Sequence, residues 1–261
     1  MAKSELKATV ERRMAIMNML TDNAEIYVHE LSEKFGVSEV TIRNDLKNLE
    51  KKRILIRARG GAMKLEPVVS YDRWLWEKDK INFQEKQRIG KAAAALIMES
   101  DTVIVDSGTT TMEVVKNISP KITNLTVITN ALNIANQVAL NQNINLIIPG
   151  GNLRKNSLSL VGSLAEKSLR NFYVDKVFIG VDGFDTHQGI STPNIDEANL
   201  NQIMIEISKE VIVVADSTKF LRRSLAFICN TDKINTVVTD DGIRDEDKRA
   251  LESAGVKVII A

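Results

Sequence analysis

Apolar positions in the first fifty residues recur at the spacing of short helices. Residues 11–21 carry a broad apolar stripe at helical spacing. Val28, Leu31 and Phe35 share one face of a second predicted helix, and Gly36 is suited to its C-terminal end. We therefore expect two short helices, the second of which ends in a tight turn.

A third predicted helix begins after Ser38, whose side chain suits the N-cap position. Ile42, Leu46 and Leu49 form one narrow buried stripe along it. The polar side of this region holds the candidate DNA contacts, which are Ser38, Thr41, Arg43, Asn44, Lys47 and Asn48. Arginine and asparagine can pair with base edges, and lysine and threonine can hold phosphates. The pattern predicts a helix-turn-helix, although a helical bundle with a polar surface would look similar.

The segment after the third helix has the pattern of a β-wing. Alternation over residues 55–58 predicts a strand, and Gly60 and Gly61 predict a turn. Such a wing would present Arg57 and Arg59 to the DNA backbone or to a minor groove. A hairpin with two incidental arginines remains an open alternative.

From residue 101 onward, apolar β-branched runs alternate with helical patterns. Seven strands are predicted, at residues 103–106, 125–129, 144–148, 176–181, 211–215, 235–239 and 256–260. Most are continuously apolar, as expected of strands covered on both faces, and helices are predicted at 84–98 and 110–118. The predicted fold class is α/β: a doubly wound, mostly parallel sheet preceded by a winged helix-turn-helix.

Small and polar residues follow most of the predicted strands at their carboxyl ends, where open parallel sheets bind ligands. The first group, residues 106–111, also opens a helix, so its backbone N–H groups would form an anion site. The candidate effector-binding residues are Asp106, Ser107, Gly108, Thr109, Thr110, Asn130, Gly150, Gly151, Arg154, Asp182, Glu197 and Lys219. Arg154 and Lys219 would add positive charge for a phosphate, and the carboxylates would hydrogen-bond sugar hydroxyls. A phosphorylated polyol therefore suits the site. Each group alone is a common turn or helix cap, but several on one edge favour a ligand site.

Composition limits the classes of protein that fit. The chain has 261 residues, 44% hydrophobic and 26% charged, which is typical of a globular protein of two domains. Cys229 is the single cysteine and the two histidines lie far apart in sequence, so no disulfide, zinc site or other cofactor is predicted. The apolar runs are too short to span a bilayer, and the first residues lack a signal-peptide pattern. We therefore expect a cytoplasmic protein that makes no membrane contact.

Charge is divided unevenly along the chain. Residues 1–65 hold 13 Lys/Arg against 9 Asp/Glu, and residues 66–261 hold 22 against 25. Within residues 41–64 the count is 8 against 2. A basic block of this density indicates a polyanion partner for that block alone, although a solvated helix face would also explain the charge.

Three segments are expected along the chain. They are a DNA-binding domain at 1–64, a linker at 65–83 and a phosphosugar-sensing domain at 84–261. The linker contains Tyr71, Trp74 and Trp76, which we expect to pack against a domain, although stacking on bases is the alternative.

The run of residues 35–50, followed by Arg59-Gly-Gly-Ala62, resembles the DNA-binding signature of the DeoR family of bacterial regulators. The family usually has glycine where Arg53 stands, so Arg53 would alter that turn or add a phosphate contact. The second half resembles the family's effector domain at residues 105–110, 127–130, 149–151, 180–182, 197–198 and 216–220. The resemblance implies a transcription regulator, usually a repressor, that binds a phosphosugar and forms a homo-oligomer of two or four subunits.

That effector domain is similar to ribose-5-phosphate isomerases, which supplies an alternative function: a sugar-phosphate isomerase with an accessory DNA-binding head. Asp182 and Asp185 match an acidic pair of the isomerases, and Glu197 resembles their catalytic glutamate. The isomerases carry a lysine shortly after the acidic pair, whereas residues 187–189 here are His-Gln-Gly. The missing lysine favours a domain that binds without turnover, so the resemblance predicts that the chain is not an enzyme.

Residues 39–45 and 189–201 most resemble regulators of amino-sugar use, which implies an amino-sugar or tagatose phosphate as effector. The resulting hypothesis is a sequence-specific regulator of a sugar or amino-sugar operon. Its hold on a double-stranded DNA operator would be relieved by a phosphorylated sugar. A DNA-binding scaffold without a ligand is the third alternative.

Overall fold

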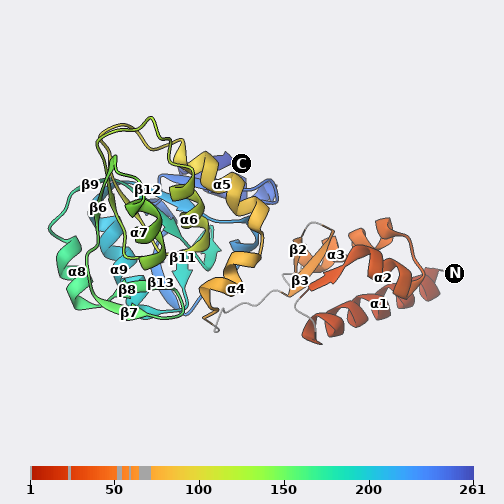
Figure 1. Cartoon of the computed structure of the whole chain (residues 1–261). Coiled ribbons are helices and arrows are strands. Elements are labelled where there is room, and N and C mark those ends of the chain that lie inside the picture. Colours follow the sequence, from red (N-terminus) through yellow and green to blue (C-terminus); the bar gives the residue numbers. More distant parts are fainter. Residues whose placement is uncertain (1, 23–24, 52–54, 59, 65–71) are drawn as a thin grey trace. The chain divides into compact units, whose positions relative to one another are not determined.

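The structure is a computed structural model of the chain, and it describes residues 2–22, 25–51, 55–58, 60–64 and 72–261. The chain divides into two compact units, Met1–Glu66 and Pro67–Ala261 (Figure 1). Each unit has a hydrophobic core of its own. No described helix is both long enough and apolar enough to traverse a bilayer.

The first unit is a three-helix domain with a small antiparallel sheet. Its helices are α1 (Ala2–Asp22), α2 (Val28–Phe35) and α3 (Glu39–Lys51), and its strands are β1 (Glu25–Tyr27), β2 (Leu55–Ala58) and β3 (Gly61–Lys64). The strands lie in the order β1-β3-β2, so β2 and β3 form the predicted wing and β1 extends it. Ile16, Leu31, Ile42 and Leu46 are fully buried, because the apolar stripes of the three helices face one core. The winged helix-turn-helix prediction is confirmed.

The turn between α2 and α3 has the local chemistry that the sequence indicated. Gly36 adopts a left-handed conformation with φ of 61° and ends α2. Ser38 Oγ accepts a hydrogen bond from the Thr41 backbone N–H at 3.2 Å, which caps the first turn of α3. The turn and the cap together fix where α3 begins.

The second unit is built on a seven-stranded parallel sheet in the order β15-β14-β12-β9-β4-β5-β6. These strands are β4 (Thr102–Val105), β5 (Leu125–Ile128), β6 (Ile144–Ile147), β9 (Val174–Gly180), β12 (Ser208–Val214), β14 (Thr236–Thr239) and β15 (Lys257–Ile260). They correspond to the seven predicted strands, so the doubly wound α/β prediction is confirmed. The strand order reverses between β4 and β9, and ligands bind at such a switch point in open α/β sheets.

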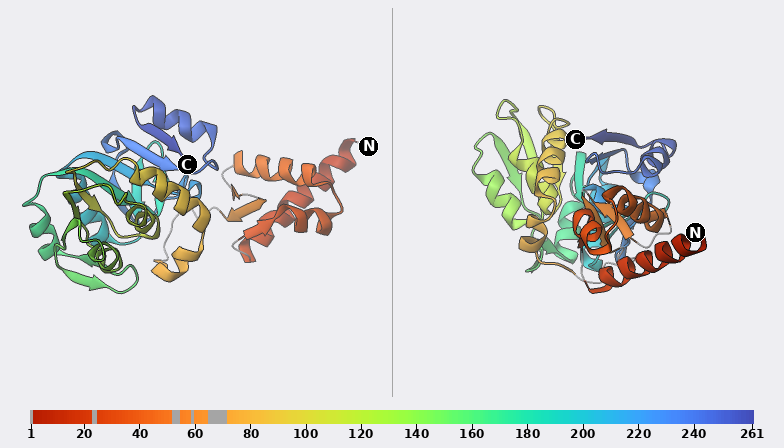
Figure 2. Two further views of the ribbon diagram at one scale, coloured as in Figure 1. Left: turned by 45° about the horizontal axis from the view of Figure 1, so that its top comes forward. Right: turned by 90° about the vertical axis from the view of Figure 1, so that its right-hand side faces the viewer.

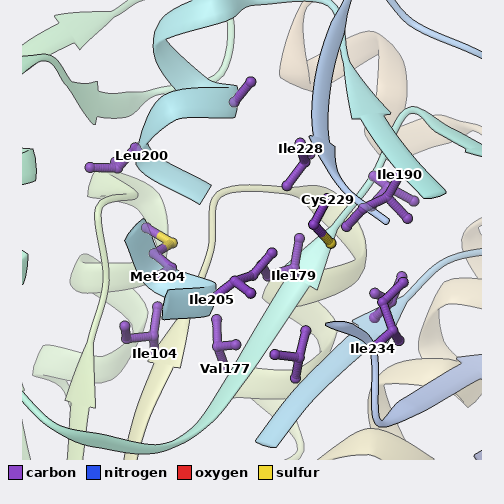
Figure 3. Close-up of a cluster of buried hydrophobic side chains, with 14 of the residues drawn as sticks. Ile104, Val177, Ile179, Ile190, Leu200, Met204, Ile205, Ile228, Cys229 and Ile234 are labelled. Atoms are coloured by element: carbon purple, nitrogen blue, oxygen red, sulfur yellow. The ribbon is translucent and has the colours of Figure 1, made fainter. Parts of the chain in front are cut away.

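Helices cover both faces of this sheet, which explains why its strands are apolar on both sides. The helices are α5 (Phe83–Ala94), α6 (Thr109–Lys116) and α7 (Leu132–Ala139) on one face, and α8 (Ser163–Leu169) and α9 (Ile195–Glu206) on the other. Alternate residues divide between the two cores: Phe178 packs on the first face, whereas Val177 and Ile179 pack on the second. Figure 3 shows these two residues beside Met204 and Ile205 of α9. α10 (Asp245–Ser253) lies beside the edge strand β15 (Figure 2).

Several short elements of the second unit have no counterpart among the predicted strands and helices. They are the helix α4 (Leu75–Lys80), the hairpin β7 (Asn152–Arg154) and β8 (Ser159–Val161), and the small sheet of β10 (Gly183–Asp185), β11 (Gly189–Thr192) and β13 (Ala226–Cys229). β7, β8 and β10 hold only three residues each, too few to show alternation, and α4 is only six residues long. Among these elements, α4 supplies Lys78 and the β7–β8 hairpin supplies Arg154 and Ser159 to the candidate site.

Candidate functional site

The polar face of α3 is exposed, as the sequence predicted. Arg43, Asn44, Lys47 and Asn48 are exposed, Ser38 is exposed at the N-cap, and Thr41 is half-buried. Arg43 Nη2 donates to Glu39 at 2.6 Å within the same helix. Exposed pairs of this kind contribute little to stability, so the guanidinium can exchange its partner readily. The face therefore offers donors that can reach a nucleic acid.

A buried carboxylate holds α3 against α1. Asp45 accepts hydrogen bonds from Arg12 Nε at 2.6 Å and Arg13 Nε at 2.7 Å, and its side chain is 3% exposed. The sequence analysis did not single out these three residues. A signal was available, because Asp45 lies next to Leu49 on the helical wheel and so borders the apolar stripe.

The wing is fastened to the end of α3. The Arg57 backbone N–H donates to Glu50 at 3.1 Å, and the Arg57 side chain is exposed. The Val28 backbone N–H donates to the Gly60 carbonyl at 2.7 Å, which joins the wing turn to α2. Arg59 and Arg53 lie outside the described residues.

Asp106 is a buried carboxylate at the carboxyl end of β4, beside the switch point of the sheet. Burial, and then the charge of Glu197, raise the pKa of Asp106 to about 7, although the backbone N–H groups of Ser107 and Gly180 favour the charged form. Such a carboxyl group can donate or accept a hydrogen bond near neutral pH. It can therefore either donate a hydrogen bond to a sugar hydroxyl or accept one from it.

The first turn of α6 follows Asp106 directly. Gly108 is the N-cap, Thr109 and Thr110 are buried, and Ser107 is half-buried. A Cβ on Gly180 would lie 3.6 Å from the Ser107 carbonyl, so this loop lies against the end of β9. The first N–H groups of an α-helix have no partner within the helix, and the helix dipole favours an anion there. The loop can therefore bind a phosphate group.

Glu197 lies at the start of α9 and joins three other elements. It accepts hydrogen bonds from Ser159 Oγ of β8 at 2.9 Å and from Thr192 Oγ1 of β11 at 3.3 Å. It also pairs with Arg154 Nη1 of β7, and Arg154 Nη2 pairs with Asp72. Arg154 is thus shared by two carboxylates, one on α9 and one before α4.

Asp182 lies just past the end of β9 and is shared by two lysines. Lys78 Nζ of α4 donates to it at 2.9 Å, and Lys219 Nζ lies 3.7 Å away. Burial would raise the pKa of Asp182, but the charges of Lys78 and Lys219 outweigh it and lower that pKa. Burial likewise opposes the charged form of Lys78, but Asp182 raises its pKa. Both groups therefore stay charged at neutral pH.

Asp216, at the end of β12, adds a further buried carboxylate. It accepts hydrogen bonds from Asn82 Nδ2 at 3.0 Å and from the Thr218 backbone N–H at 3.1 Å. Buried Lys86 lies nearby: burial lowers the pKa of Lys86 to about 8, and the charge of Asp216 opposes that change.

Five predicted residues form a connected charged group that we call the strand-end cluster: Asp106, Arg154, Asp182, Glu197 and Lys219. Arg154 pairs with Glu197, whose charge raises the pKa of Asp106, and Lys219 lies beside Asp182. The charge of Glu197 also acts on Lys78, the partner of Asp182, which joins the two halves. The cluster contains both cations and carboxylates, as a phosphorylated polyol would require.

The remaining predicted residues have local structural roles. Buried Asn130 exchanges backbone and side-chain hydrogen bonds with Leu160 of β8. Gly150 and Gly151 have φ of 81° and 120°, and a Cβ on Gly151 would lie 2.7 Å from the Val161 carbonyl. The glycines are therefore required by the turn into β7 and by its close approach to β8.

The sequence analysis missed the residues that α5 and the segment before it bring to this site. They are Asp72, Lys78, Asn82 and Lys86. The Lys78–Asp182 contact joins residues 104 positions apart, and no local pattern indicates such a pairing. Among the residues with a described placement, no group of three or more His, Cys, Asp or Glu side chains is arranged to hold a metal ion.

An exposed recognition helix with a wing, joined in one chain to an α/β domain with a charged strand-end site, defines a DNA-binding regulator with an effector domain. The DeoR-like helix-turn-helix domain matches residues 12–68, and the DeoR C-terminal sensor domain matches residues 81–241. The chain belongs to the DeoR family. The predicted family is therefore confirmed.

Relatives cover nearly the whole chain. A protein of Escherichia coli O157:H7 named as an aga operon transcriptional repressor is 40% identical over 259 residues, covering 99% of this chain and 96% of the relative. The transcriptional repressor AccR of Agrobacterium fabrum is 33% identical, covering 97% of this chain and 98% of that protein. These relatives confirm a transcription regulator and not the isomerase alternative.

Among solved structures, ribose 5-phosphate isomerase A from Methanocaldococcus jannaschii matches with a TM-score of 0.41 and 15% identity. The match covers 53% of this chain and 55% of that chain. A likeness at this level carries no weight for function, so the assignment depends on the family and on the full-length relatives.

Proposed function

We propose that this chain represses a sugar-utilisation operon and that a phosphorylated sugar, bound at the strand-end cluster, relieves the repression. The observation that carries the proposal is the convergence of Arg154, Lys219 and the α6 N-terminus with buried carboxylates at the switch point of the sheet. Cations suit a phosphate, and carboxylates suit hydroxyl groups.

For the DNA half, we place α3 in the major groove and the wing along the backbone. Arg43 and Asn44 would contact base edges, and Lys47 and Arg57 would contact phosphates. The contact set also includes Ser38, Thr41, Asn48 and Arg59. Phosphate contacts would supply much of the affinity and make it fall with salt.

For the effector half, the phosphate would bind the N–H groups of residues 107–110 with Lys219 and Arg154 beside it. Asp106, Asp182 and Glu197 would then hydrogen-bond the hydroxyl groups. The ligand can act only through different affinities for the DNA-binding and released states. Because the E. coli relative is named for the aga operon and the sequence resembles regulators of amino-sugar use, we propose an amino-sugar or tagatose phosphate as effector.

The proposed assembly is a homo-oligomer of at least two copies that binds a repeated or palindromic operator. We place it in the cytoplasm, where bacterial DNA lies. The DNA-binding domain would be residues 1–64 and the sensing domain residues 84–261, with the segment 65–83 between them.

Two measurements test this function. Footprinting on the DNA upstream of the chain's own gene should show a protected site, and calorimetry should show binding of galactosamine 6-phosphate or tagatose 6-phosphate. A bound sugar at a hundred times its Kd should raise the free energy of unfolding by about 2.7 kcal/mol. Absence of a protected site would contradict the DNA half. A thermal midpoint that no sugar phosphate changes would contradict the effector half.

A further inference from the structure

Residues 72–82 are attached to the strand-end cluster and to Asp216 by polar contacts, and we call this segment the latch. Three contacts attach it: Asp72 to Arg154, Lys78 to Asp182 and Asn82 to Asp216. The latch directly follows the segment 65–71, through which the chain leaves the DNA-binding unit. The contacts of the candidate effector site thus extend to the part of the chain nearest that unit in sequence.

The latch is held by polar groups and not by a hydrophobic core. None of the side chains of α4 is fully buried, although the helix packs against α6. The Leu75 backbone N–H donates to the Asn156 carbonyl at 2.7 Å, and Asn156 Nδ2 donates to Asp72. A segment with few buried apolar contacts opens at low free energy. Removing one of its ion pairs should therefore have a measurable effect on its position.

The two ion pairs of the latch use the groups that an anionic ligand would seek. Arg154 is divided between Asp72 and Glu197, and its side chain is 15% exposed. A phosphate group has the same sign of charge as Asp72 and competes with it for Arg154. Lys78, in contrast, is a cation that the phosphate would attract away from Asp182. The ligand would thus compete directly with Asp72 for Arg154, and it would replace Asp182 as the partner of Lys78.

We propose that a phosphorylated sugar displaces Asp72 from Arg154 and thereby releases the latch, so that Asp72 and Lys78 couple effector binding to the segment leading to the DNA-binding unit. The inference rests on the proposed function, because it takes the strand-end cluster as the effector site. The latched state is then the state without ligand, and the ligand binds the released state more tightly.

The chain carries its own reporter for this step. Its two tryptophans are Trp74 and Trp76, and both lie on the latch. Their side chains are 38% and 59% exposed, and Lys80 Nζ lies 5.6 Å from the Trp76 ring centroid. Tryptophan-selective fluorescence of the full chain therefore reports on the latch and not on the DNA-binding unit.

The decisive variant is Asp72→Asn, which removes the charge that pairs with Arg154 and leaves the size of the side chain unchanged. Without ligand, it should show most of the emission change that galactosamine 6-phosphate or tagatose 6-phosphate produces in the wild type. Loss of one charge-assisted hydrogen bond should also speed hydrogen exchange of the α4 amides by about tenfold. Lys78→Gln should have a similar effect through the other pair. Asp79→Asn, an exposed residue of the same helix, is the matched control and should keep the wild-type emission.

Calorimetry on the same samples separates the latch from the proposed function. If a sugar phosphate binds the wild type while the tryptophan emission and the exchange of residues 72–82 stay unchanged, the latch is wrong and the effector site stands. Wild-type emission and exchange in both Asp72→Asn and Lys78→Gln would also overturn the latch. If none of the sugar phosphates binds, the effector half fails and the ligand step of the latch fails with it.

Discussion

Arg43 on α3 and Arg154 in the strand-end cluster each pair with a carboxylate, but in different surroundings. The Arg43–Glu39 pair lies on the surface, with side chains 52% and 46% exposed, and joins residues four apart on one helix. The Arg154–Glu197 pair is 15% and 11% exposed and joins a hairpin to a helix of the second unit. An exposed pair contributes about 0.3–0.5 kcal/mol, so Arg43 can give up its partner easily.

The difference indicates two ways of binding an anion. The recognition face relies on solvated donors that bind phosphates by releasing counterions, and it needs little internal organisation. The strand-end cluster holds its charges in place before the ligand arrives, and each cation there already has a carboxylate partner. A ligand must therefore replace existing contacts, and this exchange can move the segments that supply them.

The largest expected effect comes from the one buried carboxylate of the recognition helix. Asp45→Ala leaves Arg12 and Arg13 without their shared partner and should destabilise the DNA-binding unit by about 3 kcal/mol, the low end for a broken buried pair, because both arginines reach solvent. Hydrogen exchange of the α1 and α3 amides should speed up about a hundredfold in the full chain. Glu39→Gln, which breaks only the exposed pair, is the control. Equal exchange rates in the two variants would contradict the expectation that the buried ion pair stabilises this unit more than the exposed pair does.

The next effect concerns DNA affinity. Arg43→Ala should weaken operator binding about 10- to 100-fold, because a paired contact with a base edge is lost. Fluorescence anisotropy with the footprinted fragment measures it. Lys209→Ala, an exposed lysine of the second unit, should bind like the wild type. If Arg43→Ala binds the operator as tightly as the control does, the placement of α3 at the DNA interface is contradicted.

A smaller effect is expected at the effector site. Lys219→Gln should weaken binding of the sugar phosphate about tenfold, because one charge-assisted hydrogen bond is lost. Its DNA binding without ligand should stay unchanged. Calorimetry on this variant, with exposed Lys233→Gln as the charge-matched control, makes the comparison. If both variants bind the sugar equally well, the cluster does not hold the phosphate.

The last prediction concerns how stability depends on pH. The pKa of Asp106 is raised from 3.8 to about 7 in the folded chain, so between these values the folded state binds more protons than the unfolded state. This residue's contribution to stability therefore falls as pH rises from about 4 to about 7. As the pH rises through that range, the melting temperature of Asp106→Asn should rise relative to that of the wild type. Above about pH 7 the difference between the two should stay constant. A difference in melting temperature that does not vary with pH would contradict the raised pKa.

The elements that the sequence predicted correctly are those with a long or repeated local signal. Most strands of the main sheet are predominantly apolar because helices cover both faces, and β2 was located by alternation over four residues. The exposed face of α3 followed from the apolar stripe of Ile42, Leu46 and Leu49 alone. Each of these inferences depends on neighbours within one turn or one strand.

The elements that the sequence could not supply depend on contacts between distant segments. Residues 72–82 fall in the segment expected to be a linker, and nothing in their pattern shows that Lys78 meets Asp182 or that Asp72 meets Arg154. The strands β7 and β8 are too short for periodicity, yet the hairpin positions Arg154. Arg154, Lys219, Asp182 and Glu197 were predicted, but Lys78 and the pairing of these charges required the fold.

The most direct test of the central claim is an operator-binding titration of the full chain with galactosamine 6-phosphate and tagatose 6-phosphate, in the wild type and in Lys219→Gln. The account predicts that at least one of these sugars lowers the operator affinity of the wild type. It also predicts that Lys219→Gln needs about tenfold more of that sugar for the same loss. An operator affinity that neither sugar changes, or an equal sugar requirement in the two proteins, would contradict it.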